Sequence, residues 1–141
     1  MDGIRLMTMV QSLWRKRASA ALEGFGITLS QFLLIQLARR RGAIRPSEAA
    51  EELASDRPTL TLVARKCVAR GWLSRLRVKL DRRAHRLRLT GLGEELPGRI
   101  EAARVLSPEV LGDPLDVLDS EERGQFLRAL DKVHRRARDL F

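Results

Sequence analysis

Hydrophobic side chains recur every three or four residues along most of the chain, which is the spacing of one face of an α-helix. This spacing predicts a long amphipathic helix over residues 4–22, which Gly24 and Gly26 end. A second helix is expected to begin at Ser30, and the apolar residues from 32 to 37 follow one another so densely that it should be buried on most sides. The sequence therefore predicts that this second helix is the centre of the core.

Two shorter helical segments are expected next. The first opens at Pro46, because proline suits the first turn of a helix. After a turn at residues 55–58, the second segment runs from Pro58 to Arg70 and is stopped by Gly71. Its inward stripe, spaced i, i+3, i+4 and i+7, consists of Leu60, Val63, Ala64 and Cys67. Its opposite arc consists of Pro58, Thr61, Leu62, Arg65, Lys66 and Ala69.

The period of the pattern then changes from helical to alternating. Residues 75–80 alternate between basic and apolar, and so do residues 86–89. Such alternation predicts a two-stranded hairpin, here with one basic face. Residues 81–86 contain no Gly or Asn to enforce a tight turn, so a longer and more mobile loop is expected at the tip.

The last third of the chain returns to the helical pattern. Thr90 begins a helical region, and Pro97-Gly98 within it predicts a kink or a break. Residues 107–114 have the composition of a linker. Asp119, with Glu122 three places on, resembles a capping box at the start of a final helix. The apolar stripe of that helix consists of Phe126, Leu127, Leu130 and Val133.

Composition limits the class of protein. A chain of 141 residues suits one domain, and its single cysteine excludes an internal disulfide framework. The longest uncharged run, residues 24–38, is too short for a membrane-spanning helix, so no membrane partner is expected. Residues 1–17 lack the order of a secretory signal, so the reducing cytoplasm is the expected compartment.

The net charge of +9 is concentrated in the middle of the chain. Residues 30–89 hold 15 Lys or Arg and 5 Asp or Glu, whereas residues 90–141 carry more acids than bases. A concentrated excess of cations is typical of proteins that bind a polyanion, although a solvated face or an anionic membrane surface is an alternative.

The order of elements is that of a winged helix-turn-helix, with a short helix, a turn, a second helix and a basic hairpin. In that arrangement the second helix enters the major groove of DNA, and the hairpin tip reaches the neighbouring minor groove. Between Arg75 and Arg88, seven cations accompany only Asp81, a density that counterion release converts into affinity for a duplex.

Several short motifs resemble the MarR family of bacterial transcriptional regulators. They are Leu29-Ser30-Gln31, Pro46-Ser47-Glu48-Ala49-Ala50, Asp56-Arg57-Pro58-Thr59-Leu60-Thr61, Arg70-Gly71-Trp72-Leu73, Asp81-Arg82-Arg83 and Leu89-Thr90-Gly91-Leu92-Gly93. The tip also resembles the SlyA-like branch. The resemblance implies a mainly α fold, with a winged helix-turn-helix lobe at residues 29–90 and a helical dimerisation region at residues 1–28 and 91–141. It further implies a homodimer on a pseudo-palindromic site, often with repression relieved by small aromatic acids.

Two residues depart from the family pattern. Many members have Asp where Ala84 stands, so an ion pair that braces the wing is absent, as it is in the SlyA-like branch. Relatives of that branch place a base-reading Arg where this chain has Leu62. Either Arg65, one turn on, takes over the guanine contact, or Leu62 packs on a thymine methyl.

Candidate functional residues follow from these motifs. Arg83 is expected to be a minor-groove finger held by Asp81. Ser47, near the start of its helix, is expected to anchor a phosphate or to cap the helix rather than to read bases. The complete expected DNA-binding set is Ser47, Arg57, Pro58, Thr59, Thr61, Leu62, Arg65, Lys66, Arg75, Asp81, Arg82, Arg83 and Arg86.

Other chemistry finds less support in the sequence. Trp14 and Arg17, one helical turn apart, are candidates to hold a small aromatic carboxylate, although core or dimer packing is the alternative for Trp14. Cys67 is expected to be a buried hydrophobe rather than a redox sensor. No catalytic grouping, cofactor motif or metal-ligand spacing is present.

The sequence thus predicts a non-enzymatic regulator that binds double-stranded DNA as a homodimer. An architectural or low-specificity DNA-binding or interaction protein is the alternative. The operator, the effector, the regulated genes and the choice between repression and activation are not determined by the sequence.

Overall fold

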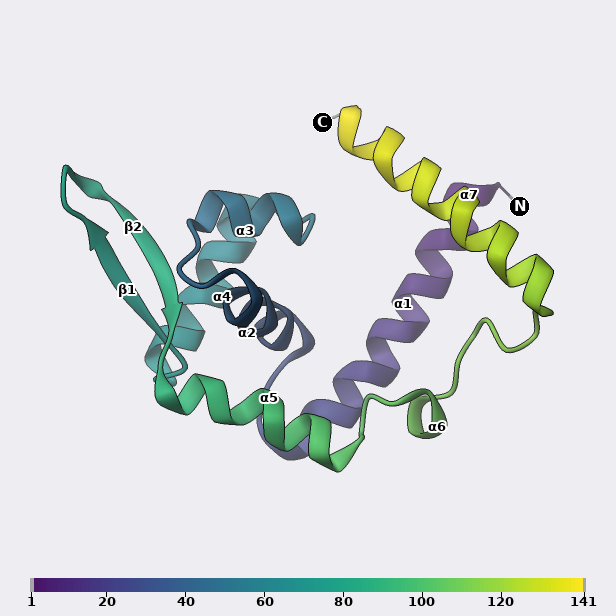
Figure 1. Cartoon of the computed structure of the whole chain (residues 1–141), viewed down its shortest axis with the longest axis horizontal. Helices are drawn as coiled ribbons and strands as arrows, with labels where there is room; N and C mark the ends of the chain where they lie inside the picture. Colours follow the sequence, from purple (N-terminus) through teal and green to yellow (C-terminus); the bar gives the residue numbers. More distant parts are fainter. Residues whose placement is uncertain (1, 141) are drawn as a thin grey trace. The chain divides into compact units, whose positions relative to one another are not determined.

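The computed structural model describes residues 2–140, and for residues 81–83 it describes the backbone without the side chains. Contacts divide the chain into two units, Met1–Leu111 and Gly112–Phe141. In the first unit the elements are α1 (Gly3–Leu22), the 3-10 turn η1 (Glu23–Phe25), α2 (Leu29–Arg41), α3 (Pro46–Glu52), α4 (Arg57–Ala69), β1 (Leu73–Val78), β2 (Asp81–Leu89), α5 (Gly91–Ala103) and α6 (Pro108–Leu111) (Figure 1). The second unit contains α7 (Ser120–Asp139).

Helix α2 is the centre of the core, as predicted. Phe32, Leu34, Ile35 and Leu37 are buried, and α2 packs against α1, α4, α5 and β2. The expected cap at Ser30 is wrong, because the helix begins at Leu29, two residues earlier than that cap implies. Thr28 caps it instead, in a capping box with Gln31.

Helices α3 and α4 form the expected helix-turn-helix; they pack on each other, and α4 also packs on α2 (Figure 1). Pro46 occupies the first turn of α3, where its missing N–H leaves no intrahelical bond unmade. In α4 the predicted inward residues Leu60, Ala64 and Cys67 are buried, and Val63 is half-buried. Exposed α4 side chains therefore point away from the lobe.

The hairpin turns more tightly than expected. Val78 pairs with Asp81, so only Lys79 and Leu80 separate the strands, and the expected long loop at residues 81–86 is wrong. The pairing register shifts between Arg77, which pairs with His85, and Val78, which pairs with Asp81. The residues of β2 between these two pairs therefore have no partner in β1, as in a β-bulge.

The register also contradicts the single basic face. Arg75 lies opposite Leu87, and Leu76 lies opposite Arg86. Because opposite residues share a face of the hairpin, Arg75 and Arg86 lie on different faces. The burial of Leu73 and Leu87 fixes this pairing register, because both residues must face the core. A shift of the register by one residue would expose them.

Backbone contacts attach the hairpin to the helices. Ile44, between α2 and α3, exchanges two hydrogen bonds with Leu87, at 2.9 and 2.8 Å. Thr90 caps α5, and its hydroxyl donates to the carbonyl oxygen of Gly71 at 2.5 Å. The base of the wing is thereby fixed at both ends.

Two expectations about the last third of the chain are corrected. Helix α5 continues through Pro97 without a break, because Leu96, Pro97 and Ile100 are all buried and their packing offsets the lost backbone bond. The expected linker at residues 107–114 contains the single turn α6. In the second unit, α7 begins at the predicted capping box of Asp119 and Glu122.

The predicted fold class is confirmed as mainly helical with one two-stranded antiparallel sheet. Within residues 2–140 no single helix is long and apolar enough to cross a membrane. The segments Gly3–Phe25 and Leu29–Arg41 meet the length and composition criteria only together, and a 79° bend separates them.

Gly93 should be irreplaceable where α5 crosses the base of the wing. A Cβ on Gly93 would overlap the carbonyl oxygen of Trp72 and lie 2.9 Å from its carbonyl carbon. That carbonyl is held by the N–H of Thr90 at 3.1 Å, so the backbone cannot yield. We expect Gly93→Ala to lower the free energy of unfolding by about 3 kcal/mol, measured by urea titration at fixed protein concentration.

Gly98, on the same helix, supplies the matched control. A Cβ there meets nothing within 4 Å. Gly98→Ala should raise the free energy of unfolding by up to about 1 kcal/mol, because alanine restricts the unfolded chain and favours helix. Equal effects of the two substitutions would contradict the steric argument.

Candidate nucleic-acid interface

The outer face of α4 is exposed along the whole length of the helix. Its exposed residues are Arg57, Pro58, Thr59, Thr61, Leu62, Arg65, Lys66, Ala69 and Arg70. These include every α4 residue of the expected DNA-binding set. Since neighbouring helices bury the inner stripe, the outer face is available to a groove of DNA.

The N-terminus of α4 is held by one carboxylate. Oδ1 of Asp56 accepts from the backbone N–H of Thr59 at 2.7 Å, and Oδ2 accepts from the hydroxyl of Thr59 at 2.7 Å. The hydrogen bond from the backbone of Thr59 has the larger effect on Asp56, and the one from the Thr59 hydroxyl has the smaller. Both hold the pKa of Asp56 below its usual value. The cap is therefore ionised at neutral pH, where it also suits the positive end of the helix.

The two threonines of α4 already use their hydroxyl protons. Thr59 donates to Asp56, and Thr61 donates to the carbonyl oxygen of Arg57 at 2.8 Å. Either oxygen can still accept a hydrogen bond, but neither hydroxyl is a free donor. Arg65 and Lys66 form no ion pair with any described side chain, so they are the available donors of the middle of this face.

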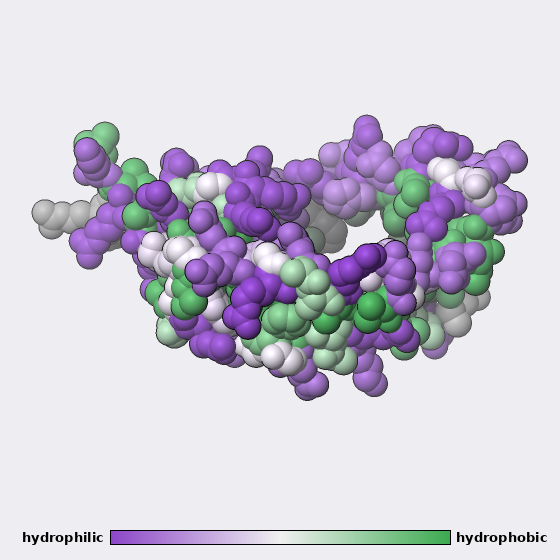
Figure 2. All heavy atoms as spheres, turned by 60° about the horizontal axis from the view of Figure 1, so that its bottom comes forward, coloured by the Kyte–Doolittle hydropathy of each residue, from purple (hydrophilic) through white to green (hydrophobic). Residues whose placement is uncertain are grey.

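The wing supplies cations on both of its faces. Arg75 is exposed on one face, and Arg86 is half-buried on the other, opposite Leu76. Neither pairs with a carboxylate among the described side chains. Figure 2 shows hydrophilic and apolar side chains mixed at the hairpin end, on the left. The side chains of Asp81, Arg82 and Arg83 lie outside the described residues, so the finger expected at Arg83 stays a prediction.

Ser47 is the second residue of α3 and is exposed. The expectation that it caps the helix is wrong, because the cap position belongs to Arg45. The position of Ser47 fits the expected phosphate contact, because the backbone N–H groups at a helix start have no intrahelical partners. Nearby, Arg45 and Glu48 pair with each other at 3.7 Å. That ion pair does not involve the hydroxyl of Ser47.

Arg70 connects α4 to a distant turn. Its Nη1 donates to the carbonyl oxygen of Gly26 at 3.1 Å, and its guanidinium lies 4.4 Å from the centre of the Trp72 ring. This residue thus joins the end of α4, the start of β1 and the turn between α1 and α2. Sequence reasoning missed this contact, because no local pattern relates residues 44 positions apart.

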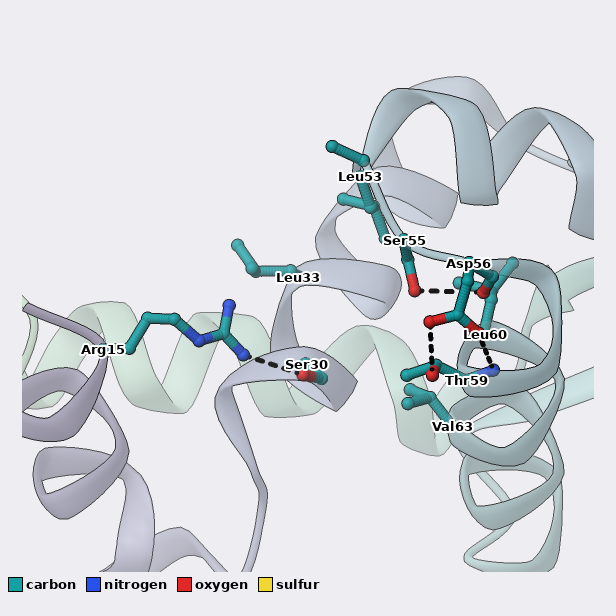
Figure 3. A pocket seen from close by; sticks show the side chains of 10 residues that line it. Arg15, Ser30, Leu33, Leu53, Ser55, Asp56, Thr59, Leu60 and Val63 are labelled. Atoms are coloured by element: carbon teal, nitrogen blue, oxygen red, sulfur yellow. Dashed lines mark hydrogen bonds between the residues drawn. The ribbon is translucent and has the colours of Figure 1, made fainter. Parts of the chain in front are cut away.

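A cavity of about 230 Å³ lies where α1, α2 and the α3–α4 turn meet (Figure 3). Arg15 reaches into it from α1, and its Nη2 donates to the hydroxyl of Ser30 at 3.1 Å. Asp56 and Thr59 line the other side, with Leu33 and Val63 among the apolar walls (Figure 3). The cavity therefore shares residues with the cap of α4.

The residues expected to hold a ligand are not those that line this cavity. Trp14 is half-buried and Arg17 is exposed, and neither belongs to the lining. The apolar spacing of α1 indicated which turn approaches the lobe, but not which of three neighbouring side chains faces it. The buried residues Ala18 and Leu22 fix that rotation and turn Arg15 inward.

Cys67 is wholly buried on the inner stripe of α4, as expected. Burial raises the pKa of its thiol to about 12, and the nearby charge of Arg70 opposes this rise only in part. A thiol in this state packs as a small hydrophobe.

A helix-turn-helix whose second helix has an exposed outer face, followed by a cationic hairpin, defines the winged helix-turn-helix fold, which is typical of nucleic-acid-binding proteins. Comparison with known proteins narrows this class. The model of the MarR family matches residues 27–85. The transcriptional regulator PecS of Dickeya dadantii (strain 3937) is 28% identical over 130 residues, which cover 90% of this chain and 76% of PecS.

Solved structures share the fold over nearly the whole chain. A mutant of MarR from E. coli in complex with operator DNA superposes with a TM-score of 0.80 and 25% identity, covering 92% of this chain and 91% of that one. The transcriptional regulator SlyA superposes with a TM-score of 0.82 and 17% identity, covering 99% of this chain and 96% of that one. The chain is thus similar to transcriptional regulators of the MarR family, in sequence over the winged helix-turn-helix lobe and in fold over nearly its whole length.

The thiol of Cys67 should be inert in the folded protein. With a pKa of about 12, about one thiol in ten thousand is ionised at pH 8, and burial blocks access to it. We expect a thiol-reactive disulfide reagent to leave native protein unmodified over minutes. In urea the same reagent should titrate one thiol per chain at once. Rapid modification of the native protein would contradict the buried, neutral state.

Proposed function

We propose that this chain is a transcriptional regulator of the MarR family that binds double-stranded DNA sequence-specifically, as a homodimer on a pseudo-palindromic promoter site, in the cytoplasm. The observation that carries the proposal is the exposed outer face of α4, with Arg65 and Lys66 unpaired, beside an exposed cationic wing. The operator complex of the E. coli MarR mutant, which has the same fold, supports it.

In the proposed complex, α4 lies in the major groove and the hairpin tip in the adjacent minor groove. Arg65 contacts base edges, and Lys66, Arg75 and Arg86 neutralise phosphates. Arg57 and Ser47 lie near helix starts, where phosphate contacts are common. At the tip, Arg82 and Arg83 are proposed to enter the minor groove, with Asp81 as their brace.

Two apolar surfaces support the homodimer. On α1 the exposed large hydrophobic residues are Ile4, Leu6, Met7, Met9, Val10 and Leu13. On α7 they are Phe126, Leu127, Leu130 and Val133. Apolar surface on this scale is uncommon on soluble monomers, and a second copy would cover it. Two lobes held about 34–36 Å apart would then match successive major grooves.

The cavity beside Arg15 is the proposed site for a small aromatic carboxylate. The guanidinium would pair with the carboxylate, and the leucine and valine walls would contact the ring. Because the cavity touches both α1 and the cap of α4, a ligand there would favour one arrangement of α4 relative to the dimerisation helix. The partner of the carboxylate is thus proposed to be Arg15 rather than Trp14 or Arg17.

An architectural or low-specificity DNA-binding protein is the second candidate. The cations on both faces of the hairpin favour it, because they would hold any duplex through its phosphates. The two candidates differ in how strongly they prefer one sequence.

Affinity for a selected duplex relative to a random one separates the candidates. The full chain would select duplexes from a random pool, and fluorescence anisotropy at fixed salt would measure both affinities. A regulator should prefer the selected duplex by about 10³-fold or more. Light scattering should give a mass of twice 16.0 kDa. A ratio near one would support the architectural protein and overturn the proposal.

Arg65 and Lys66 should differ in what they contribute. Arg65→Ala should lower the preference for the selected duplex by about 1–3 kcal/mol, because a base contact is lost. Lys66→Ala should weaken both duplexes alike and reduce the slope of log K against log salt by about one. Each variant is therefore the control for the other. Identical behaviour on both duplexes would refute this division.

A further inference from the structure

The outermost stripe of α4 is largely apolar. Pro58, Leu62, Arg65 and Ala69 follow one another at steps of four, three and four residues, and all are exposed. The first three each stand two residues before a buried residue, which is about 200° around a helix, so they face directly away from the lobe. Arg65 is the one polar side chain on this stripe.

Leu62 dominates the stripe. Half of its surface is exposed, and it is the one large hydrophobic side chain exposed on α2, α3 or α4, whose residues are all described. The core does not need the side chain of Leu62, because Leu60 and Ala64 already fill the inner face of α4. Its position is therefore explained by what lies outside the lobe.

The threonines of α4 have a limited capacity to form hydrogen bonds with bases. The hydroxyl protons of Thr59 and Thr61 are already donated to Asp56 and to the backbone. Arg65 and Lys66 are therefore the free donors at the centre of the helix, and the outermost stripe beside Arg65 offers carbon to the groove. In the major groove, the apolar feature of a base edge is the C5-methyl group of thymine.

We propose that Leu62, flanked by Pro58 and Ala69, reads thymine methyl groups in the major groove, while Arg65 reads the adjacent guanine. This inference rests on the proposed function and names the base chemistry of its site. Neighbouring Arg65 and Lys66 match the charge of a DNA groove. A protein partner would need a larger apolar surface than one leucine provides.

The test removes one methyl at a time from the DNA. Deoxyuridine pairs like thymidine but lacks the C5-methyl, so it would replace each thymidine in turn in the duplex selected by the wild-type chain. At one or more thymines in each half-site, the substitution should weaken binding about fourfold per methyl, as expected for burial of one carbon. Thymines outside the α4 contact should show no change.

A thermodynamic cycle assigns the effect to Leu62. Because the homodimer loses the contact in both half-sites, Leu62→Ala should bind the thymidine duplex about sixteenfold more weakly. At each contacted position its ratio of thymidine to deoxyuridine affinity should fall to about one. Leu92→Ala is the matched control, because Leu92 is similarly exposed but lies on α5. That variant should keep the wild-type ratio. Circular dichroism would verify that both variants are folded.

The outcomes are distinguishable. If the wild-type chain binds both duplexes equally, or if Leu62→Ala keeps the wild-type ratio, the inference is wrong while the proposed function stands. If the pool yields no preferred duplex, the proposed function fails, and the inference fails with it.

Discussion

The structure depends on the burial of α2 from almost every side. Leu34 and Ile35 are wholly inaccessible, and fully burying such a side chain stabilises a fold by about 1.5–3 kcal/mol. Because α1, α4, α5 and β2 all pack on this one helix, their positions are fixed through it. The exposed face of α4 follows from the same packing, since the residues that contact α2 cannot also face solvent.

Charge is distributed unevenly over this frame. At the end of α2, Arg39 pairs with Glu101 and Arg41 with Glu52, so these cations are balanced within the chain. Exposed pairs of this kind contribute little to stability. In contrast, the cations of α4 and of the described part of the wing have no carboxylate partner. The net positive charge is therefore presented where a polyanion would lie.

Local patterns predicted most of the helices, because period and caps are properties of neighbouring residues. The capping box at Asp119 is an example. The exact residue at which a helix begins was harder to predict. Thr28 and Ser30, two positions apart, both suit a helix cap, and only the packing of α2 selects Thr28.

Features that join distant segments could not be predicted. The faces of the hairpin depend on its register, which Leu73 and Leu87 fix by entering the core. The contact of Arg70 with Gly26 depends on the complete fold. The cavity is a similar case, because a shift of one residue along α1 turns a side chain by about 100°. Trp14, Arg15 and Arg17 therefore face different surroundings, which only tertiary packing distinguishes.

Affinity and specificity would come from different elements of such a lobe. The cations of the wing release counterions from any duplex, so they add affinity without preference. Preference must then come from α4, whose outer stripe offers one guanidinium and a few carbon groups. Each such contact discriminates weakly. A two-fold dimer counts every contact twice, so the free-energy difference between right and wrong sequences doubles when both half-sites are engaged. A sparse recognition helix is thus compatible with strong preference only if the two lobes are held at a fixed spacing. In the proposed homodimer, the apolar faces of α1 and α7 would therefore be as important for recognition as α4 itself.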